Sequence, residues 1–462
     1  MADKLLDGKI AGSIDYYVTS EPSNDEVREA SLLIIVEALR AQEVQLLDIV
    51  MYLGEALNDT GNPQRRCQAI NLLTACLSQA QLTLNFKHVE TFTNFFCTKL
   101  ADYQCTEGAV GGIWVLLRHY GAVLREQSGE ALPAHIARTL FKEVHVSSHT
   151  QHVRKMVLDV VHALISEWHD DMSRLGEALG EGVSNTIEME RDPRNLLFSF
   201  SIAKQLLEEY EPACVSEETI KAFFETLTSY FPITFTPPKD DKYGITGDDL
   251  RLGLNEACGA TTRFAELVIP FLLDNAKDIT SGEAKATIEQ ALHMIGFCLE
   301  RYGPKVAREH LGIILGTACD QVRRTTTPCQ KEFAALVGRA LSVACRGVSP
   351  GLYPSWFGRQ VDPHIDTLGA DAGKLDGPQA AVQASRSLLL AAAGAHPGLL
   401  ERAWALTVPK LLPSEEGAGS ADQGALRFAL EMARLADAPA GAPSLLAPRR
   451  VKPALAGALA AL

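Results

Sequence analysis

The sequence lacks most of the motifs that carry chemistry in enzymes and metalloproteins. Its ten cysteines include no C-x-x-C pair, although an iron–sulfur or zinc centre normally shows at least one close pair. No G-x-x-x-x-G-K-[ST] segment is present, so there is no phosphate-binding loop of that kind. We therefore predict that the chain is not an enzyme and has no cofactor and no metal site.

Positive charge is also scarce. The 462 residues include 43 Lys and Arg against 57 Asp and Glu, which gives a formal net charge of −14 and a pI near 5.4. Contact with a phosphate backbone needs clustered Lys and Arg, whereas the basic runs at 65–66, 323–324 and 449–452 are short. Such short runs are typical of solvated surface, and we expect no direct binding of nucleic acid.

Long apolar segments are missing as well. The longest uncharged apolar run, 387–400, is too short to span a bilayer and contains Pro397. The N-terminal residues MADKLLDGKIAGS lack a basic segment followed by an apolar core, so no signal peptide is evident. We expect no membrane contact, a cytoplasmic and nuclear location, and cysteines that are reduced and mostly buried.

Amphipathic helices make up most of the chain. Apolar residues recur at steps of three and four, as they do at Leu32, Ile35, Val36 and Leu39, and this spacing predicts helices. A second helix is expected to begin near Gln42. The further predicted helices cover 64–79, 87–101, 108–126, 132–142, 150–168, 192–210, 261–278, 282–302, 304–320, 329–346, 378–394, 398–411, 421–436 and 452–462.

These helices form antiparallel pairs that return about every 40 residues, the period of HEAT or armadillo repeats. The predicted fold class is therefore all-α, an α-solenoid of HEAT/ARM-like antiparallel helix pairs. A compact helical bundle is the alternative, but it needs one large core. We predict a tail over 1–22, a solenoid over 23–325, and continuing repeats with Gly/Pro/Ala-rich loops over 326–462, including long loops at 349–378 and 413–424.

Three histidines have a spacing compatible with metal ligands. His145, His149 and His152 follow the pattern H-x3-H-x2-H and would share a face on one continuous helix. The segment SSHTQ is instead typical of a turn, with Ser147 or Ser148 capping the next helix. Since no carboxylate or cysteine follows as a completing ligand, we predict a polar loop. An enzyme with a histidine-bound metal remains the alternative.

Other short matches have simpler interpretations. The G-x-S-x-G match at 347–351 follows a helix and contains Pro350, which has no N–H to donate, so we predict a turn. The S-x-x-K match at 201–204 lies within a predicted helix. Asp248 and Asp249 suit the positive end of a helix. Cys97 and Cys105 have seven residues between them, and we expect Cys97 to be core.

One stretch, 230–246, interrupts the helical pattern. Its apolar residues alternate with Thr and Pro until two consecutive prolines forbid a helix. We consider it a candidate protein-interaction loop, although its large apolar residues are more typical of a plug in the groove between helices. The candidate residues are Phe231, Ile233, Phe235, Pro237, Pro238, Asp240 and Asp241.

Several segments together resemble the N-terminal domain of the Mms-nineteen (Met-eighteen) family, over about residues 25–325. The block FPITFTPP at 231–238, followed by D-L and T-x-R-F-A-E, is the most specific part. The segment 141–161, which contains the three histidines, also resembles an inter-helix segment of this family. The remaining segments that carry the resemblance are 72–103, 192–206, 244–250 and 261–274.

The resemblance implies a non-catalytic HEAT-repeat adaptor of cytosolic iron–sulfur protein assembly, linked also to nucleotide excision repair and transcription. Such an adaptor bridges the WD-repeat and small acidic subunits of the targeting complex to apo-clients such as an XPD-type helicase and DNA polymerases. The resemblance places partner docking in a C-terminal HEAT block, which we expect to be absent here. A fragment, a truncated isoform and a divergent short member all fit that expectation.

A nuclear transport receptor or a phosphatase-type scaffold is the alternative function. Proteins of these classes also use acidic helical solenoids. Binding that depends on Ran or on cargo would favour this alternative.

Overall fold

The computed structural model shows a chain built from helices. It describes residues 6–20, 25–125, 132–210, 212–239, 244–277, 284–323, 329–374, 379–411 and 423–437. Within these ranges there is no β-strand, and none of the helices is long and apolar enough to cross a membrane. The predicted all-α class is confirmed.

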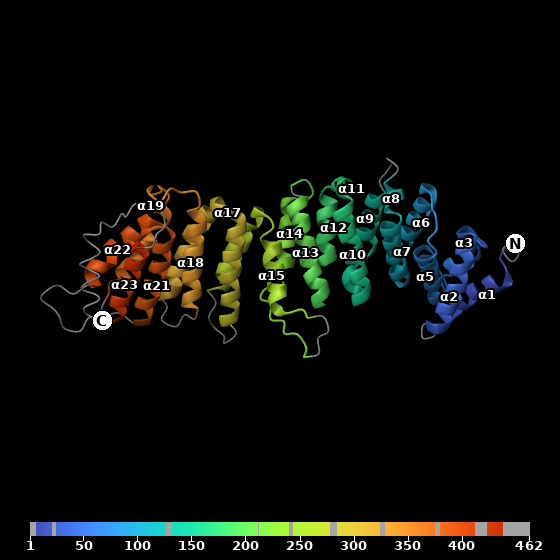
Figure 1. The fold of residues 1–462 in the computed structure, drawn as a ribbon, viewed down its shortest axis with the longest axis horizontal. Coiled ribbons are helices and arrows are strands. Elements are labelled where there is room, and N and C mark those ends of the chain that lie inside the picture. Colours follow the sequence, from blue (N-terminus) through green and yellow to red (C-terminus); the bar gives the residue numbers. More distant parts are fainter. Residues whose placement is uncertain are drawn as a thin grey trace. The chain divides into compact units, whose positions relative to one another are not determined.

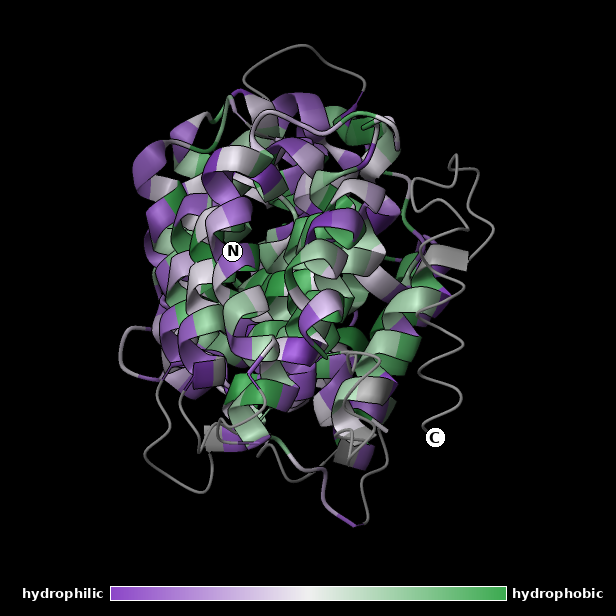
Figure 2. Cartoon of the chain, turned by 90° about the vertical axis from the view of Figure 1, so that its left-hand side faces the viewer, coloured by the Kyte–Doolittle hydropathy of each residue, from purple (hydrophilic) through white to green (hydrophobic). Residues whose placement is uncertain are grey.

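The chain divides into two compact units. Unit 1 comprises Met1–Ser229 and Phe235–Ala257, and unit 2 comprises Tyr230–Thr234 and Cys258–Leu462. This division does not coincide with the boundary predicted near 325, which came from composition and family resemblance and stays a prediction. Figure 2 shows hydrophobic residues mainly where helices face one another and hydrophilic residues mainly on outward faces.

Unit 1 contains most of the shorter helices. They are α1 (Gly8–Thr19), α2 (Asp25–Arg40), α3 (Leu46–Tyr52), α4 (Gly54–Leu57), α5 (Pro63–Gln79), α6 (Phe86–Lys99), η2 (Tyr103–Cys105), α7 (Thr106–His119), α8 (Gly121–Leu124), α9 (Leu132–Glu143), η3 (Val146–Ser148), α10 (Gln151–Glu167), α11 (His169–Ser173), α12 (Glu177–Ile187), α13 (Pro193–Glu209), α14 (Glu217–Thr228) and α15 (Gly247–Cys258).

The helices of unit 1 stack in two layers, and their order can be followed in Figure 1. In one layer α5 packs against α7, α7 against α10, and α10 against α13. In the other, α6 packs against α9, α9 against α12, and α12 against α14. Contacts of α6 with α7 and of α12 with α13 join the layers. Each pair of helices, one from each layer, therefore packs against the pairs before and after it, and the predicted α-solenoid is confirmed.

Sequence signals at the helix starts explain where these helices begin. The side chain of Asn62 accepts a backbone N–H at the start of α5, and Pro63 follows as the first helical residue. Asp192 and Pro193 repeat this arrangement at α13, and Thr150 caps α10. Each cap satisfies an N–H that the helix itself leaves unpaired.

Buried tyrosines at the ends of helices link successive repeats. Each hydroxyl donates a hydrogen bond to a backbone carbonyl 43, 45 or 44 residues earlier in the chain. This separation is close to the repeat length predicted from the sequence. The pairs are Tyr120 with Leu77 and Tyr210 with Ile165 in unit 1, and Tyr302 with Cys258 in unit 2.

Unit 2 continues the helical stack with longer helices. α16 packs against α17, α17 against α18, and α18 against α21, while α20, α22 and α23 all contact α21. α17 is two helices joined at Gly303, which has φ 85° and precedes Pro304, as predicted from the sequence. The elements are η4 (Thr262–Phe264), α16 (Ala265–Asn275), α17 (Ala284–Arg323), α18 (Gln330–Ala344), α19 (Phe357–Gln360), α20 (Asp362–Ala372), α21 (Gln379–Ala395), α22 (Pro397–Leu411) and α23 (Gln423–Asp437).

Several helices lie where none was predicted. α1 occupies the segment expected to be a tail, and α20 lies within 349–378, so the prediction of one long loop there was wrong. Both bury apolar residues at helical spacing, such as Ile10 and Ile14 in α1 and Ile365 and Leu368 in α20. α12, α14 and the short helices α11 and α19 also lie outside the predicted helices. Of the predicted loop at 413–424, residues 413–422 lie outside the described residues, and 423–424 begin α23; the predicted helix at 452–462 also lies outside the described residues.

Candidate functional site

The insert that interrupts the helices is held by the side chain of Gln290 from α17. The backbone N–H of Ile233 donates to Gln290 Oε1 at 3.0 Å, and Gln290 Nε2 donates to the carbonyl of Ile233 at 3.1 Å. Ile233 itself is only 5% exposed. The amide therefore satisfies both backbone groups of a buried residue, and Ile233 serves the internal packing of unit 2.

The other members of the predicted interaction loop differ in exposure. Phe231 is half-buried and meets Phe271 of α16 edge to face, with ring centroids 5.9 Å apart. Phe235 and Pro237 are half-buried and Pro238 is exposed. The two remaining predicted residues, Asp240 and Asp241, lie outside the described residues. Accessible apolar surface in this loop therefore lies at 235–238 and, in part, at Phe231.

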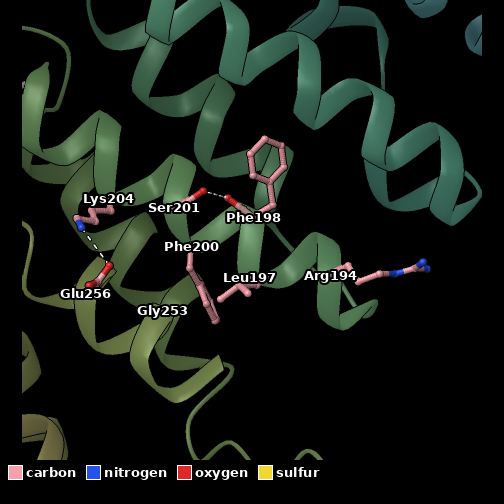
Figure 3. Close-up of a pocket in the computed structure, with 8 residues that line it drawn as sticks. All are labelled: Arg194, Leu197, Phe198, Phe200, Ser201, Lys204, Gly253 and Glu256. Atoms are coloured by element: carbon pink, nitrogen blue, oxygen red, sulfur yellow. Dashed lines mark hydrogen bonds and ion pairs between the residues drawn. The ribbon is translucent and has the colours of Figure 1, made fainter. Parts of the chain in front are cut away.

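A hollow of about 280 Å³ lies between α13 and α15 in unit 1. Gly253 makes room for it, because a methyl group there would lie 2.9 Å from Leu197 Cδ1. Lys204 and Glu256 form an ion pair at 3.0 Å at one end, and Figure 3 shows Arg194 pointing away from the others at the opposite end. The lining residues are Arg194, Leu197, Phe198, Phe200, Ser201, Lys204, Gly253 and Glu256.

Polar side chains of α10 lie over Phe198, one of the residues that line the hollow. The ammonium of Lys155 lies 4.6 Å from the ring centroid of Phe198, and the ring of His162 lies 5.0 Å from it. Ser201 Oγ donates to the carbonyl of Phe198 within the same helix. These contacts make a mixed aromatic and polar surface around Phe198.

A buried ion pair fixes the start of α13. Glu190, which is 4% exposed, accepts hydrogen bonds from Arg154 Nη2 at 2.6 Å and Nε at 2.9 Å. Burial by itself raises the pKa of Glu190. The carboxylate also accepts hydrogen bonds from Arg154, from the backbone N–H groups of Arg191 and Asp192, and from Asn195. Together these hydrogen bonds outweigh the effect of burial, so the pKa of Glu190 lies below its usual value. The carboxylate is therefore structural.

The three histidines do not converge. His149 stacks on Tyr103 with ring centroids 4.6 Å apart, while His152 faces Glu107, with Nε2 3.8 Å from Oε1. Residues 146–148 form a 3-10 turn, so the predicted turn is confirmed. The predicted cap was wrong, because Thr150 caps α10 instead of Ser147 or Ser148. Across the part of the chain that the structure describes, no group of three or more His, Cys, Asp or Glu could hold a metal ion.

The remaining motif interpretations agree with the structure. Ser201 and Lys204 lie within α13, and Gly347, with φ 77°, follows the end of α18 in a turn. Cys97 is 2% exposed, and burial raises its pKa to about 11. Asp248 lies in the first turn of α15, as predicted.

Sequence reasoning missed one pair of side chains. Cys105 was compared with Cys97, its neighbour in sequence, but in the structure its sulfur lies 3.3 Å from that of Cys67. The two residues are 38 positions apart, and they meet because α5 packs against η2. No local spacing signals this contact.

A family model matches most of unit 1 and the beginning of unit 2. The family is described as "Dos2-interacting transcription regulator of RNA-Pol-II" (MMS19_N), and its model matches residues 50–322. This match covers more than half of the 462-residue chain.

Curated proteins match the same region. The "MMS19 nucleotide excision repair protein homolog" of Dictyostelium discoideum is 30% identical over 290 residues, which cover 63% of this chain and 25% of that protein. The protein of the same name from Mus musculus is 28% identical over 373 residues, 79% of this chain and 34% of that protein. The "DNA repair/transcription protein mms19" of Schizosaccharomyces pombe is 29% identical over 270 residues, 57% of this chain and 25% of that protein.

The chain thus spans about a quarter to a third of the length of these curated relatives. Among solved structures, a mutant of Kap121p aligns with 98% of this chain and 43% of that chain, with a TM-score of 0.45 and 13% identity. The fold class rests on the helix order and contacts described above.

The extent of the family match leads to one conclusion: the chain belongs to the MMS19_N family of Dos2-interacting transcription regulators of RNA-Pol-II.

Proposed function

We propose that this chain is a non-catalytic adaptor of the cytosolic iron–sulfur protein assembly targeting complex. In this role it helps to deliver iron–sulfur clusters to apo-proteins of DNA repair, replication and transcription. The observation that carries the proposal is the family match over residues 50–322. The names of the relatives, which refer to nucleotide excision repair and to DNA repair/transcription, support the same area of biology.

The proposed partners are of two kinds. On one side are the WD-repeat and small acidic subunits of the targeting complex, and on the other are apo-clients such as an XPD-type helicase and DNA polymerases. These partners, and a location in both cytoplasm and nucleus, follow from the resemblance carried by segments such as 231–238 and 261–274. The cluster is cargo in this proposal.

The physical character of unit 1 supports a binding role. Two layers of stacked helices expose successive helix faces over α10, α13 and α15, and such surfaces suit the binding of other proteins. The charged groups near the hollow are engaged in structural pairs, as Lys204 is with Glu256. Near the hollow, the hydroxyl of Ser201 donates a hydrogen bond to the carbonyl of Phe198 within the same helix.

A binding measurement with a purified client tests the proposal. The chain is immobilised, and an XPD-type helicase is passed over it in its apo form and in its cluster-loaded form. We expect the apo form to bind about tenfold more tightly, a difference of about 1.4 kcal/mol, because an adaptor for delivery must release the loaded product. Equal binding of both forms, or no binding, would contradict the proposal.

Variants of the insert locate the contact. Phe235→Ala removes a half-buried aromatic ring from the accessible part of the insert. Leu352→Ala is the control, because it removes an apolar side chain that is 60% exposed and lies outside the insert. If the insert contacts the client, the first variant weakens binding and the second does not. Equal binding by both variants would assign the client surface to another part of the chain.

A further inference from the structure

We propose that Cys67 and Cys105 form a reversible disulfide when the protein meets a hydroperoxide, which makes this pair a thiol modification site between neighbouring repeats. The proposal is independent of the adaptor role. It rests on the contact between the two sulfurs, on their different exposure, and on the charged groups beside them.

The two sulfurs are already in contact. Cys67 Sγ lies 3.3 Å from Cys105 Sγ, and the Cys67 thiol donates a hydrogen bond to the carbonyl of Gln104 at 2.9 Å. Cys67 belongs to α5, and Cys105 ends the one-turn helix η2 just before α7. A disulfide needs an S–S distance of about 2.05 Å, so the sulfurs must approach only slightly, and the short η2 turn is the element that would move.

The two cysteines differ in exposure in the way that a redox pair requires. Cys67 is half-buried, so a small oxidant in solution can reach it. Cys105 is 1% exposed, so its thiol reaches Cys67 rather than solvent. All ten cysteines lie within the described residues, and the other nine are buried.

The environment also favours Cys67 as the attacking sulfur. The hydrogen bond with Cys105 lowers the pKa of Cys67 and is the largest influence on it. Burial and the negative charges of Asp102 and Glu107 oppose this change, and the guanidinium of Arg66 adds to the lowering. The hydrogen bond to Cys67, together with burial, raises the pKa of Cys105, which therefore keeps its proton. Arg66 is held in place by Asp102, with Nε 2.6 Å from Oδ2.

The other thiols lack this activation. Cys76, which shares α5 with Cys67, is 0% exposed, and burial raises its pKa to about 12. Burial likewise raises the pKa of Cys298 to about 12. Because the thiolate is the reacting form, oxidation is expected to begin at Cys67.

The reaction balances with a hydroperoxide as the oxidant. With hydrogen peroxide, the Cys67 thiolate attacks one oxygen, an S–O bond forms, the O–O bond breaks, and the departing hydroxide takes a proton to become water. Cys105 then attacks the sulfenic sulfur of Cys67. The S–S bond forms, the S–O bond breaks, and hydroxide leaves with the proton of Cys105 as a second water. Two electrons pass from the sulfurs to the peroxide.

Peptide mapping of the full chain tests the proposal. The reduced protein is treated with hydrogen peroxide, blocked with N-ethylmaleimide and digested with trypsin. We expect one dominant linked product, peptide 67–87 joined to peptide 100–118, which disappears on reduction. Retention of both free thiols at peroxide concentrations that oxidise free cysteine would overturn the proposal, as would sulfinic or sulfonic acid at Cys67 without the link.

Three variants assign the roles, and circular dichroism confirms that each is folded. Cys105→Ser should leave Cys67 as a sulfenic acid that dimedone traps, and Cys67→Ser should lose both the link and the trapped product. Cys76→Ala is the matched control, because Cys76 lies on the same tryptic peptide, and it should keep the link. A link that survives Cys67→Ser or vanishes with Cys76→Ala would contradict the assignment.

Discussion

Glu190 is a charged residue whose ionisation is part of the fold. Its carboxylate accepts two hydrogen bonds from Arg154 while almost fully buried. Asn195, which is 0% exposed, donates to the same carboxylate at 3.1 Å. These bonds tie α10 to the start of α13, so the negative charge supports the stacking of two repeats.

Replacing Glu190 by Gln should therefore destabilise unit 1. Breaking a buried ion pair leaves Arg154 without the carboxylate that accepts two of its hydrogen bonds, and we expect a loss of about 3 kcal/mol at neutral pH. The measurement is urea denaturation followed by helical circular dichroism. Glu107→Gln is the control, because Glu107 is exposed with a side-chain exposure of 59%, and its effect should stay below about 0.5 kcal/mol.

The same residue predicts a dependence on pH. The pKa of Glu190 in the folded protein lies below the usual value of a glutamate side chain, so the folded state favours the ionised form. The stability that this contributes is fully present above the unfolded pKa and is lost as pH falls through the folded pKa. Urea midpoints should therefore fall below about pH 4.5, and less steeply in Glu190→Gln. Equal slopes in the two proteins would contradict this account.

At the scale of elements, hydrogen bonds from buried tyrosines link successive repeats. The carbonyl of Ile165 belongs to the last turn of α10, where carbonyls lack helical partners, and the hydroxyl of Tyr210 supplies the missing hydrogen bond at 2.5 Å. Tyr210→Phe should cost about 1–2 kcal/mol, because a buried acceptor is left unpaired.

Tyr103→Phe provides the matched comparison for this prediction. Its hydroxyl also donates to a carbonyl, that of Ser148, but Tyr103 is 57% exposed, so water replaces the lost bond. Urea denaturation of both variants should show a clear loss for Tyr210→Phe only. Equal losses would mean that burial of the acceptor is not what matters.

The hydrogen bonds between Gln290 of α17 and the insert predict the effect of replacing this one side chain. Gln290→Ala removes both hydrogen bonds that hold the backbone of Ile233, so the amide of Ile233 should lose its protection against hydrogen exchange. The rate should rise by about tenfold, for a loss of about 1.4 kcal/mol. His293→Ala, at an exposed position of the same helix, should leave that amide unchanged.

Elements with strong caps and large apolar residues could be predicted from the sequence. α5, α10 and α13 begin with polar caps and carry regular apolar spacing, and their positions agree closely with the prediction. α20 was missed because Gly369 and its Asp and Pro residues are typical of loops, although Ile365 and Leu368 bury one face.

In the candidate site, the burial of Ile233 depends on Gln290, 57 residues away. Sequence spacing carries no such long-range information.

At the scale of the whole molecule, the chain is an α-solenoid for which we propose an adaptor role. The chain belongs to the MMS19_N family over residues 50–322 and spans about a quarter to a third of its curated relatives. The adaptor proposal requires that this part bind two sets of proteins, the targeting subunits and the apo-clients.

Co-purification tests that requirement most directly. The 462-residue chain is isolated under mild conditions, and the retained proteins are identified by mass spectrometry. The account predicts retention of the WD-repeat subunit, its small acidic partner and iron–sulfur clients such as the XPD-type helicase. Clients retained without the two subunits would contradict the bridging role. Absence of all three, with a Ran-type GTPase or phosphatase subunits in their place, would contradict the proposed function as a whole.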